Sequence, residues 1–198
     1  MNLYMVEKLN LPKDEVPEMR RTYFETYGTT LRGLQIHYGI DPNEYLAYVH
    51  DLPLADYLKP DPYLRQMVME LPLKKWIFTN ADDAHARRVL NILGLPDCFD
   101  GIIDIRAVDF VCKPDMEAFQ RLMRLVGERE AGTCVYLDDS ARNLDTAREM
   151  GFYTILVGTK QPHPGARQSI ASIHDLRTTM PELWERRDGH HGQEKGHG

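Results

Sequence analysis

The sequence predicts an α/β protein in which a parallel sheet carries helices on both faces and a small all-helical subdomain precedes it. Two patterns indicate this fold class. Residues 1–60 carry apolar residues at helical spacing throughout, whereas residues 61–184 alternate short apolar runs with amphipathic stretches. Short apolar strands separated by helices are typical of a parallel sheet that is covered on both faces.

The first 60 residues are expected to form helices only. Apolar residues recur at helical spacing over 15–27, 30–38 and 43–49, and the stretches between them are rich in Gly, Pro and Asp. Residues 1–9 have the pattern of a helix whose beginning is absent, because no N-cap residue precedes them. We therefore expect a helical cap subdomain over 1–60.

The predicted core, 61–184, alternates helices and strands. Helices are expected over 62–70, 84–93, 115–126 and 144–150, and strands over 75–78, 101–105, 134–137 and 153–157. Pro62 near the start of one helix and Gly94 after the end of another support these boundaries. The Gly- and His-rich stretch 185–198 is expected to form a disordered tail.

Composition limits the function. The formal net charge of −6 argues against binding a nucleic acid polymer, which needs a basic surface. No apolar run approaches the roughly 18 residues of a membrane span, and MNLYMVEKLN lacks the basic and apolar regions of a signal peptide. Cys98, Cys112 and Cys134 are few and widely spaced, which favours free thiols in a reducing cytoplasm.

The most informative stretch is TCVYLDDSARN, residues 133–143. An apolar strand ends there on Asp138 and Asp139, and Ser140 is a candidate N-cap for the next helix. Ligands of open α/β sheets bind beyond the carboxyl ends of the strands. Adjacent carboxylates repel unless a cation such as Mg²⁺, which prefers oxygen ligands, neutralises them. The pair alone is equally compatible with a solvated acidic turn.

Two further strand ends carry polar residues. Thr79 and Asn80 follow the strand 75–78, and a hydroxyl with free backbone N–H groups before a helix forms an anion site. Lys113 stands just before the Pro-started helix 115–126 and could neutralise a phosphate and the carboxylates. Taken singly, a helix cap and a solvated lysine explain these residues as well.

The order of these stretches resembles motifs two, three and four of the haloacid dehalogenase (HAD) superfamily. The resemblance covers Met1 to about Trp184 and is to the pyrimidine 5′-nucleotidase-like branch, in GTTLRGLQIHYGID, YVHDL, IFTNADDAHARRVLNILGL, FDGIIDI, CKPDMEAF and YLDDSARNLDTAREMGFYTILVG. It implies a HAD-like Rossmannoid parallel sheet with a helical cap. It also implies Mg²⁺-dependent hydrolysis of a small phosphorylated metabolite, first of all a nucleoside monophosphate, through an aspartyl-phosphate.

The resemblance assigns roles in phosphate binding. Thr79 would hold a phosphate oxygen through its hydroxyl, with backbone donors at Asn80 and Ala81. Lys113 would bridge the phosphoryl group and the nucleophile. Chemistry of this kind depends on positioning and charge neutralisation.

The resemblance also assigns metal ligands and cap residues. Asp139 would bind Mg²⁺ directly, Asp138 directly or through water, and Asn143 would brace their loop. Arg32 and His50 are candidates for contacting the substrate from the cap. For these two, a surface ion pair and a helix-end cap are at least as well supported.

One expected motif has no counterpart. The first HAD motif is a strand followed by Asp-x-Asp, whose first aspartate is the nucleophile, yet no two aspartates here are separated by a single residue. We therefore expect an N-terminally incomplete chain that is inactive as given and lacks the central first strand. The alternative is a non-catalytic paralogue that binds a phosphorylated small molecule or a protein partner.

The missing strand has a structural consequence. In the superfamily it lies between the strands that here are 75–78 and 134–137. Without it, these two strands should stand about 9–10 Å apart, with no hydrogen bonds between them.

Overall fold

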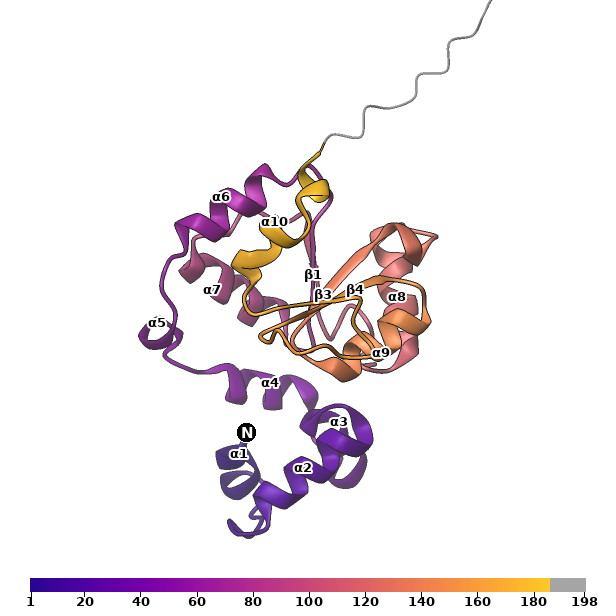
Figure 1. The fold of residues 1–198 in the computed structure, drawn as a ribbon. Helices are drawn as coiled ribbons and strands as arrows, with labels where there is room; N and C mark the ends of the chain where they lie inside the picture. The colour runs from indigo at the N-terminus through magenta and orange to yellow at the C-terminus, as the bar shows by residue number, and fades with distance from the viewer. Residues whose placement is uncertain (186–198) are drawn as a thin grey trace, which may run out of the picture.

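Four helices form the first part of the chain, and a shared set of buried side chains holds them together (Figure 1). They are α1 (Asn2–Glu7), α2 (Val16–Tyr27), α3 (Thr30–Tyr38) and α4 (Pro42–His50). The computed structural model describes residues 1–185. Each helix contributes two or more buried residues, and the ring of Tyr4 meets that of Tyr45 edge-on at 4.9 Å.

The α/β part follows a linker that holds a short helix, α5 (Leu54–Tyr57), which the sequence did not predict. Its main elements are α6 (Pro62–Glu70), β1 (Trp76–Phe78), α7 (Asp83–Leu93), β2 (Gly101–Ile103), α8 (Met116–Val126), β3 (Val135–Asp138), α9 (Ala141–Glu149), β4 (Tyr153–Val157), β5 (Gln168–Ile170) and α10 (Leu176–Thr179). Every predicted helix and strand is present, with ends shifted by up to three residues. β5 and α10 were not predicted.

The strands form two sheets, β1–β2 and β3–β4–β5, and all the pairs are parallel. Within the described residues, β1 and β3 share no backbone hydrogen bond, as the sequence predicted. Alternate residues of a parallel strand direct their backbone groups to opposite edges. Because the N–H of Thr79 reaches β2, bonding Ile103 O at 3.0 Å, Phe78 directs its groups away from β2. The expected spacing of 9–10 Å stays a prediction.

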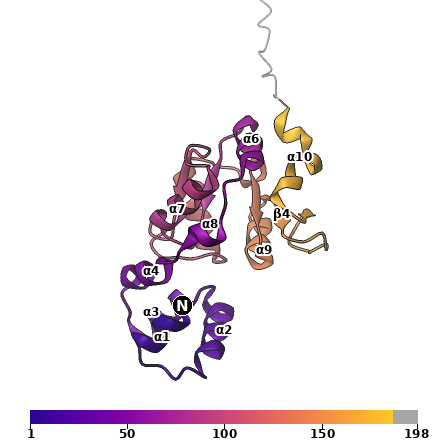
Figure 2. The ribbon, with the colours of Figure 1, turned by 90° about the vertical axis from the view of Figure 1, so that its left-hand side faces the viewer.

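Helices cover both faces of the strands, as the alternation of side chains requires. Phe78 of β1 and Tyr136 of β3 point to the face covered by α8 and α9. Ile77 and Leu137 point to the opposite face, which is covered by α6 with α7 and by α6 with α10, respectively. Figures 1 and 2 show the helices α1–α4 gathered at one end of this layered part. The α/β fold expected from the sequence, with parallel strands and helices on both faces, is therefore present.

Phe119 of α8 connects the two sheets through the core. Its side chain is fully buried, and its ring meets Phe78 of β1 at 5.5 Å and Tyr136 of β3 at 5.2 Å, edge-on in both cases. Since no backbone bonds join β1 to β3, these aromatic contacts are a main link between the sheets.

Three other expectations concern limits of the chain. None of the described helices is long and apolar enough to cross a membrane. The tail predicted over 185–198 lies outside the described residues, apart from Glu185. The division into 1–60 and 61–184 stays a prediction, although the strands all lie after residue 75.

Replacing Phe119 by alanine should weaken the whole α/β part. We expect Phe119→Ala to lower the free energy of unfolding by about 3–5 kcal/mol, because it leaves a cavity between the sheets. Leu125→Ala is the matched control, since Leu125 lies on the same helix with 48% of its surface exposed. Urea denaturation followed by circular dichroism measures both, and equal losses would contradict the linking role.

Candidate functional site

The carboxylate of Asp138, at the end of β3, is bound by protein donors on both oxygens. Oδ1 accepts hydrogen bonds from the backbone N–H of Ser140 at 2.8 Å and from Asn143 Nδ2 at 3.0 Å. Oδ2 accepts from Tyr136 OH at 2.6 Å and from Lys113 Nζ at 2.9 Å. Ser140 does stand at the N-cap position of α9, but its side chain forms no capping bond.

The ammonium of Lys113 lies between the two sheets. Besides Asp138, Nζ donates to the carbonyl of Phe78 at 2.9 Å and to Tyr136 OH at 3.1 Å. It also lies 4.9 Å from the centroid of the Phe78 ring. Only 8% of Lys113 is exposed. A buried ammonium is tolerable because all three of its protons have acceptors.

These contacts set the protonation state of Asp138. Burial alone would raise the pKa of the carboxyl, but the Lys113 ammonium and the hydrogen bonds to the carboxylate outweigh it, so the pKa lies below its ordinary value. Burial and the neighbouring Asp138 charge raise the pKa of Tyr136. The hydroxyl therefore stays protonated and donates a hydrogen bond to Asp138.

Asp139 differs from its neighbour. Its side chain is exposed and makes no hydrogen bond or ion pair within the described residues. Mg²⁺ in phosphate-processing sites is held by one or two carboxylates, with waters and phosphate completing the coordination. Asp139 fits such a site, whereas both oxygens of Asp138 already accept hydrogen bonds from the protein, so the role of Asp138 as a metal ligand stays a prediction. In the described part of the chain, no three His, Cys, Asp or Glu side chains gather as a metal cluster.

Thr79 and Asn80 lie just beyond β1 and organise the loop. Thr79 Oγ1 accepts a hydrogen bond from the backbone N–H of Ala81 at 3.0 Å. The sequence predicted that this N–H would donate to a phosphate, but in the structure it is engaged within the loop. The side chain of Asn80 accepts from the backbone N–H of Lys113 at 2.9 Å and donates to its carbonyl at 3.0 Å. Asn80 thereby fixes the backbone that carries the Lys113 ammonium.

His50 contacts Asp82 at the junction of the helical and α/β parts. His50 Nδ1 lies 2.9 Å from Asp82 Oδ2, and the His50 ring stacks on His85 at 4.1 Å. Asp82 also caps α7 by accepting the N–H of His85 at 2.7 Å. None of these contacts places His50 with Lys113 or Asp138, so its proposed substrate contact stays a prediction.

Arg32 is exposed and lines a pocket of about 460 Å³ between the helical and α/β parts. Gly28, Cys112, Pro114 and Arg142 share this pocket, so Arg32 lies near the backbone on both sides of Lys113. None of Thr79, Asp138 and Asp139 lines it. Its role in substrate binding stays a prediction.

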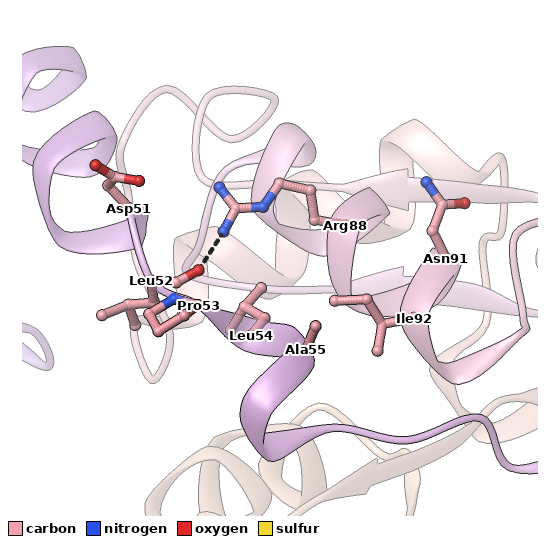
Figure 3. A pocket seen from close by; sticks show the side chains of 8 residues that line it. All are labelled: Asp51, Leu52, Pro53, Leu54, Ala55, Arg88, Asn91 and Ile92. Atoms are coloured by element: carbon pink, nitrogen blue, oxygen red, sulfur yellow. Dashed lines mark hydrogen bonds between the residues drawn. The ribbon is translucent and has the colours of Figure 1, made fainter.

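A second pocket, of about 470 Å³, lies beside the linker and away from these residues (Figure 3). Its lining includes the apolar side chains of Leu54 and Ile92. Arg88 Nη2 donates across its edge to the carbonyls of His50 at 3.0 Å and Leu52 at 3.1 Å. The Arg88 hydrogen bonds join the linker to α7, and none of the predicted site residues lines this pocket.

The sequence analysis missed three members of these networks. Tyr136 was taken only as part of an apolar strand, although its position two residues before Asp138 puts both on one face. The Phe78 carbonyl is a backbone group with no sequence signal. Asp82 was not singled out, because its partner His50 lies 32 residues away in the sequence.

A family comparison identifies the fold that carries this site. The family model described as haloacid dehalogenase-like hydrolase matches residues 9–151. The chain belongs to the haloacid dehalogenase-like hydrolases. The resemblance read from the sequence is confirmed at the level of this superfamily.

A curated relative agrees with this membership. Phosphate metabolism protein 8 of Saccharomyces cerevisiae is 34% identical over 158 residues, which are 73% of this chain and 49% of the relative. The chain thus spans about half the length of this relative.

Solved structures of HAD proteins share the fold. The HAD-hydrolase YfnB from Bacillus subtilis, bound to magnesium, aligns with a TM-score of 0.61 at 14% identity over 89% of this chain and 87% of that one. A HAD phosphatase from Thermococcus onnurineus gives 0.55 at 19%, over 90% and 86%. L-2-haloacid dehalogenase from Xanthobacter autotrophicus gives 0.56 at 18%, over 78% and 75%. At such identities, the likeness concerns the fold alone.

The Asp82 contacts predict a pH-dependent contribution to the stability of this HAD fold. Burial alone would raise the pKa of Asp82, but the hydrogen bonds from the His85 N–H and His50 outweigh it, and the pKa is lowered. The ionised form therefore stabilises the fold above the unfolded pKa of about 4, and this contribution is lost as the pH falls through the lower, folded value.

We expect Asp82→Asn to lower the free energy of unfolding by about 1–2 kcal/mol at pH 7, because the hydrogen bonds lose their charged acceptor, and the difference from the wild type to shrink below about pH 4. Urea denaturation at both pH values measures this. Asp83→Asn is the control, because the Asp83 carboxylate is 43% exposed. A difference that stays constant with pH would contradict the assignment.

Proposed function

We propose that this chain provides the phosphate- and metal-binding part of a Mg²⁺-dependent phosphate-monoester hydrolase that acts through an aspartyl-phosphate. The substrate class is small phosphorylated metabolites, with nucleoside monophosphates the first to test. The observation that carries the proposal is the position of the Lys113 ammonium, 2.9 Å from both the Phe78 carbonyl and Asp138, with exposed Asp139 next in the chain. A cation and carboxylates then meet at the carboxyl ends of two parallel strands.

The chain's own residues would divide the work as follows. Thr79 and the Asn80 backbone would orient the phosphoryl group, and the side chain of Asn80 would keep Lys113 in register with them. Lys113 would balance the charge of the phosphoryl oxygens. Asp139, supported by Asp138, would hold Mg²⁺, which when bound supplies further charge neutralisation to the phosphoryl oxygens.

The nucleophile is the part that these residues do not supply. Asp138 is saturated by four donors, and Asp82 is engaged with His50 and the start of α7. We propose that the attacking aspartate belongs to a strand that pairs with β1 and β3 together. Within the described residues, no strand pairs with the edge of β1 toward which Phe78 directs its backbone groups, nor with the edge of β3 that faces away from β4. These two unpaired edges support this position. The chain as given is accordingly expected to lack turnover.

The second candidate is a non-catalytic paralogue that binds a phosphorylated small molecule or a protein partner. The observation in its favour is the lack of any Asp-x-Asp pair in the sequence. Reading the genomic sequence upstream of Met1 separates the two. An in-frame strand with Asp-x-Asp favours the hydrolase, and a stop codon without it favours the paralogue.

The decisive experiment compares the chain as given with a protein completed by that upstream strand. We expect hydrolysis of nucleoside monophosphates with Mg²⁺ only from the completed protein, because losing a nucleophile leaves rates orders of magnitude lower. In the completed protein, Asp139→Asn should lower kcat/KM about 10²–10³-fold. Phosphate release at saturating Mg²⁺ is the measurement.

Asp145→Asn is the matched control, because Asp145 lies on the adjacent helix α9 with 53% of its side chain exposed. If the chain as given hydrolyses the substrate and Asp139→Asn abolishes this turnover, the nucleophile lies within the present residues. A completed protein without activity would favour the paralogue.

A further inference from the structure

Tyr136 is the one residue of the Lys113 network whose role the proposed function leaves open. It is 8% exposed, and its ring is held by Phe119 at 5.2 Å and Phe152 at 5.9 Å. Its hydroxyl meets Lys113 and Asp138 together, at 3.1 Å and 2.6 Å. The ring is thus fixed by packing, which gives the hydroxyl a fixed position between a cation and a carboxylate.

The direction of each hydrogen bond follows from chemistry. An ammonium can only donate, so Tyr136 Oη accepts from Lys113. A hydroxyl has one proton, and the Tyr136 proton therefore goes to Asp138 Oδ2. With Phe78 O, Tyr136 Oη and Asp138 Oδ2 as acceptors, all three ammonium protons of Lys113 are used. No proton remains for an anion in this arrangement.

Lys113 must therefore exchange one acceptor to bind a phosphoryl oxygen. Asp138 is a poor choice, because charge-assisted hydrogen bonds are the strong ones. The Phe78 carbonyl is also a poor choice, because leaving it would strand a half-buried backbone acceptor at the free edge of β1. Tyr136 forms the longest of the three bonds, and its hydroxyl stays bonded to Asp138 after Lys113 leaves.

We propose that Tyr136 is a positioning residue that holds Lys113 in the ligand-free arrangement, and that anion binding exchanges the Tyr136 hydroxyl for a phosphate oxygen. The proposal rests on the proposed function, in that Lys113 is taken as the phosphate ligand. Tyr136 then also keeps Asp138 Oδ2 hydrogen-bonded while Lys113 serves the anion. The hydroxyl sets the affinity of the site, whereas the ring serves the core.

The test measures the binding of inorganic phosphate to the full chain at fixed pH and Mg²⁺ concentration. Tyr136→Phe keeps the ring and frees one Lys113 proton, so we expect phosphate to bind about two- to tenfold tighter, the equivalent of one hydrogen bond. Tyr153→Phe on β4 is the matched control and should leave the affinity unchanged, because the Tyr153 hydroxyl bonds Gln168 alone among the described residues. Lys113→Met should remove the binding.

A second measurement uses the wild-type chain and needs no variant to fold. The ¹⁵Nζ resonance of Lys113 should show slowly exchanging protons without phosphate and should shift when phosphate is added. If Tyr136 had only a packing role, Tyr136→Phe would change neither this Lys113 resonance nor the phosphate affinity. Equal or weaker binding by Tyr136→Phe, binding undetectable in both proteins, or binding that persists in Lys113→Met would overturn the proposal.

The two proposals fail separately. Tighter phosphate binding by Tyr136→Phe, combined with an inactive completed protein, would leave the role of Tyr136 in place and remove the hydrolase. If the completed protein is active but Tyr136→Phe has an unchanged phosphate affinity, the hydrolase proposal stays and the role of Tyr136 is removed.

Discussion

The burial of the Lys113 ammonium is the constraint on which the arrangement of the site depends. An uncompensated charge in a protein interior is very costly, so the surrounding elements must bring acceptors to it. They come from the end of β1, through the Phe78 carbonyl, and from β3, through Tyr136 and Asp138. One side chain thereby fixes the ends of two strands that share no backbone hydrogen bond in the described part of the chain.

The same residue ties the helical part to the site through its backbone. Asn80 holds both peptide groups of Lys113 from the β1 side. Gly28, at the end of α2, packs against the Lys113 carbonyl so closely that an added Cβ would lie 2.8 Å from it. Since Gly28 also has a φ of +82°, a side chain there is excluded by both conformation and space. The end of α2 therefore packs directly against the backbone of Lys113.

Much of the fold and the main polar residues could be predicted because they depend on local patterns. Apolar runs that end in Asp138 or Thr79 mark strand ends. These ends belong to separate sheets, and Lys113 bonds the end of β1 and the end of β3 together. The partners could not be predicted, because they depend on which strand faces which helix. Tyr136 has the composition of a core residue, and only packing against α8 aims its hydroxyl. The contact between His50 and Asp82 could not be predicted, because the two residues are 32 positions apart in the sequence.

The two free strand edges link stability to chemistry. Phe78 directs its backbone groups away from β2, and by the same alternation Val135 and Leu137 of β3 direct theirs away from β4. A parallel strand bonded to both edges would pair the N–H of Phe78 and the backbone groups of Val135 and Leu137, at about 1 kcal/mol each. Its carboxyl end would arrive beside Lys113, whose ammonium already bonds the Phe78 carbonyl at that edge. The position that would join the two sheets is thus also the position from which the proposed attacking aspartate would reach the cation.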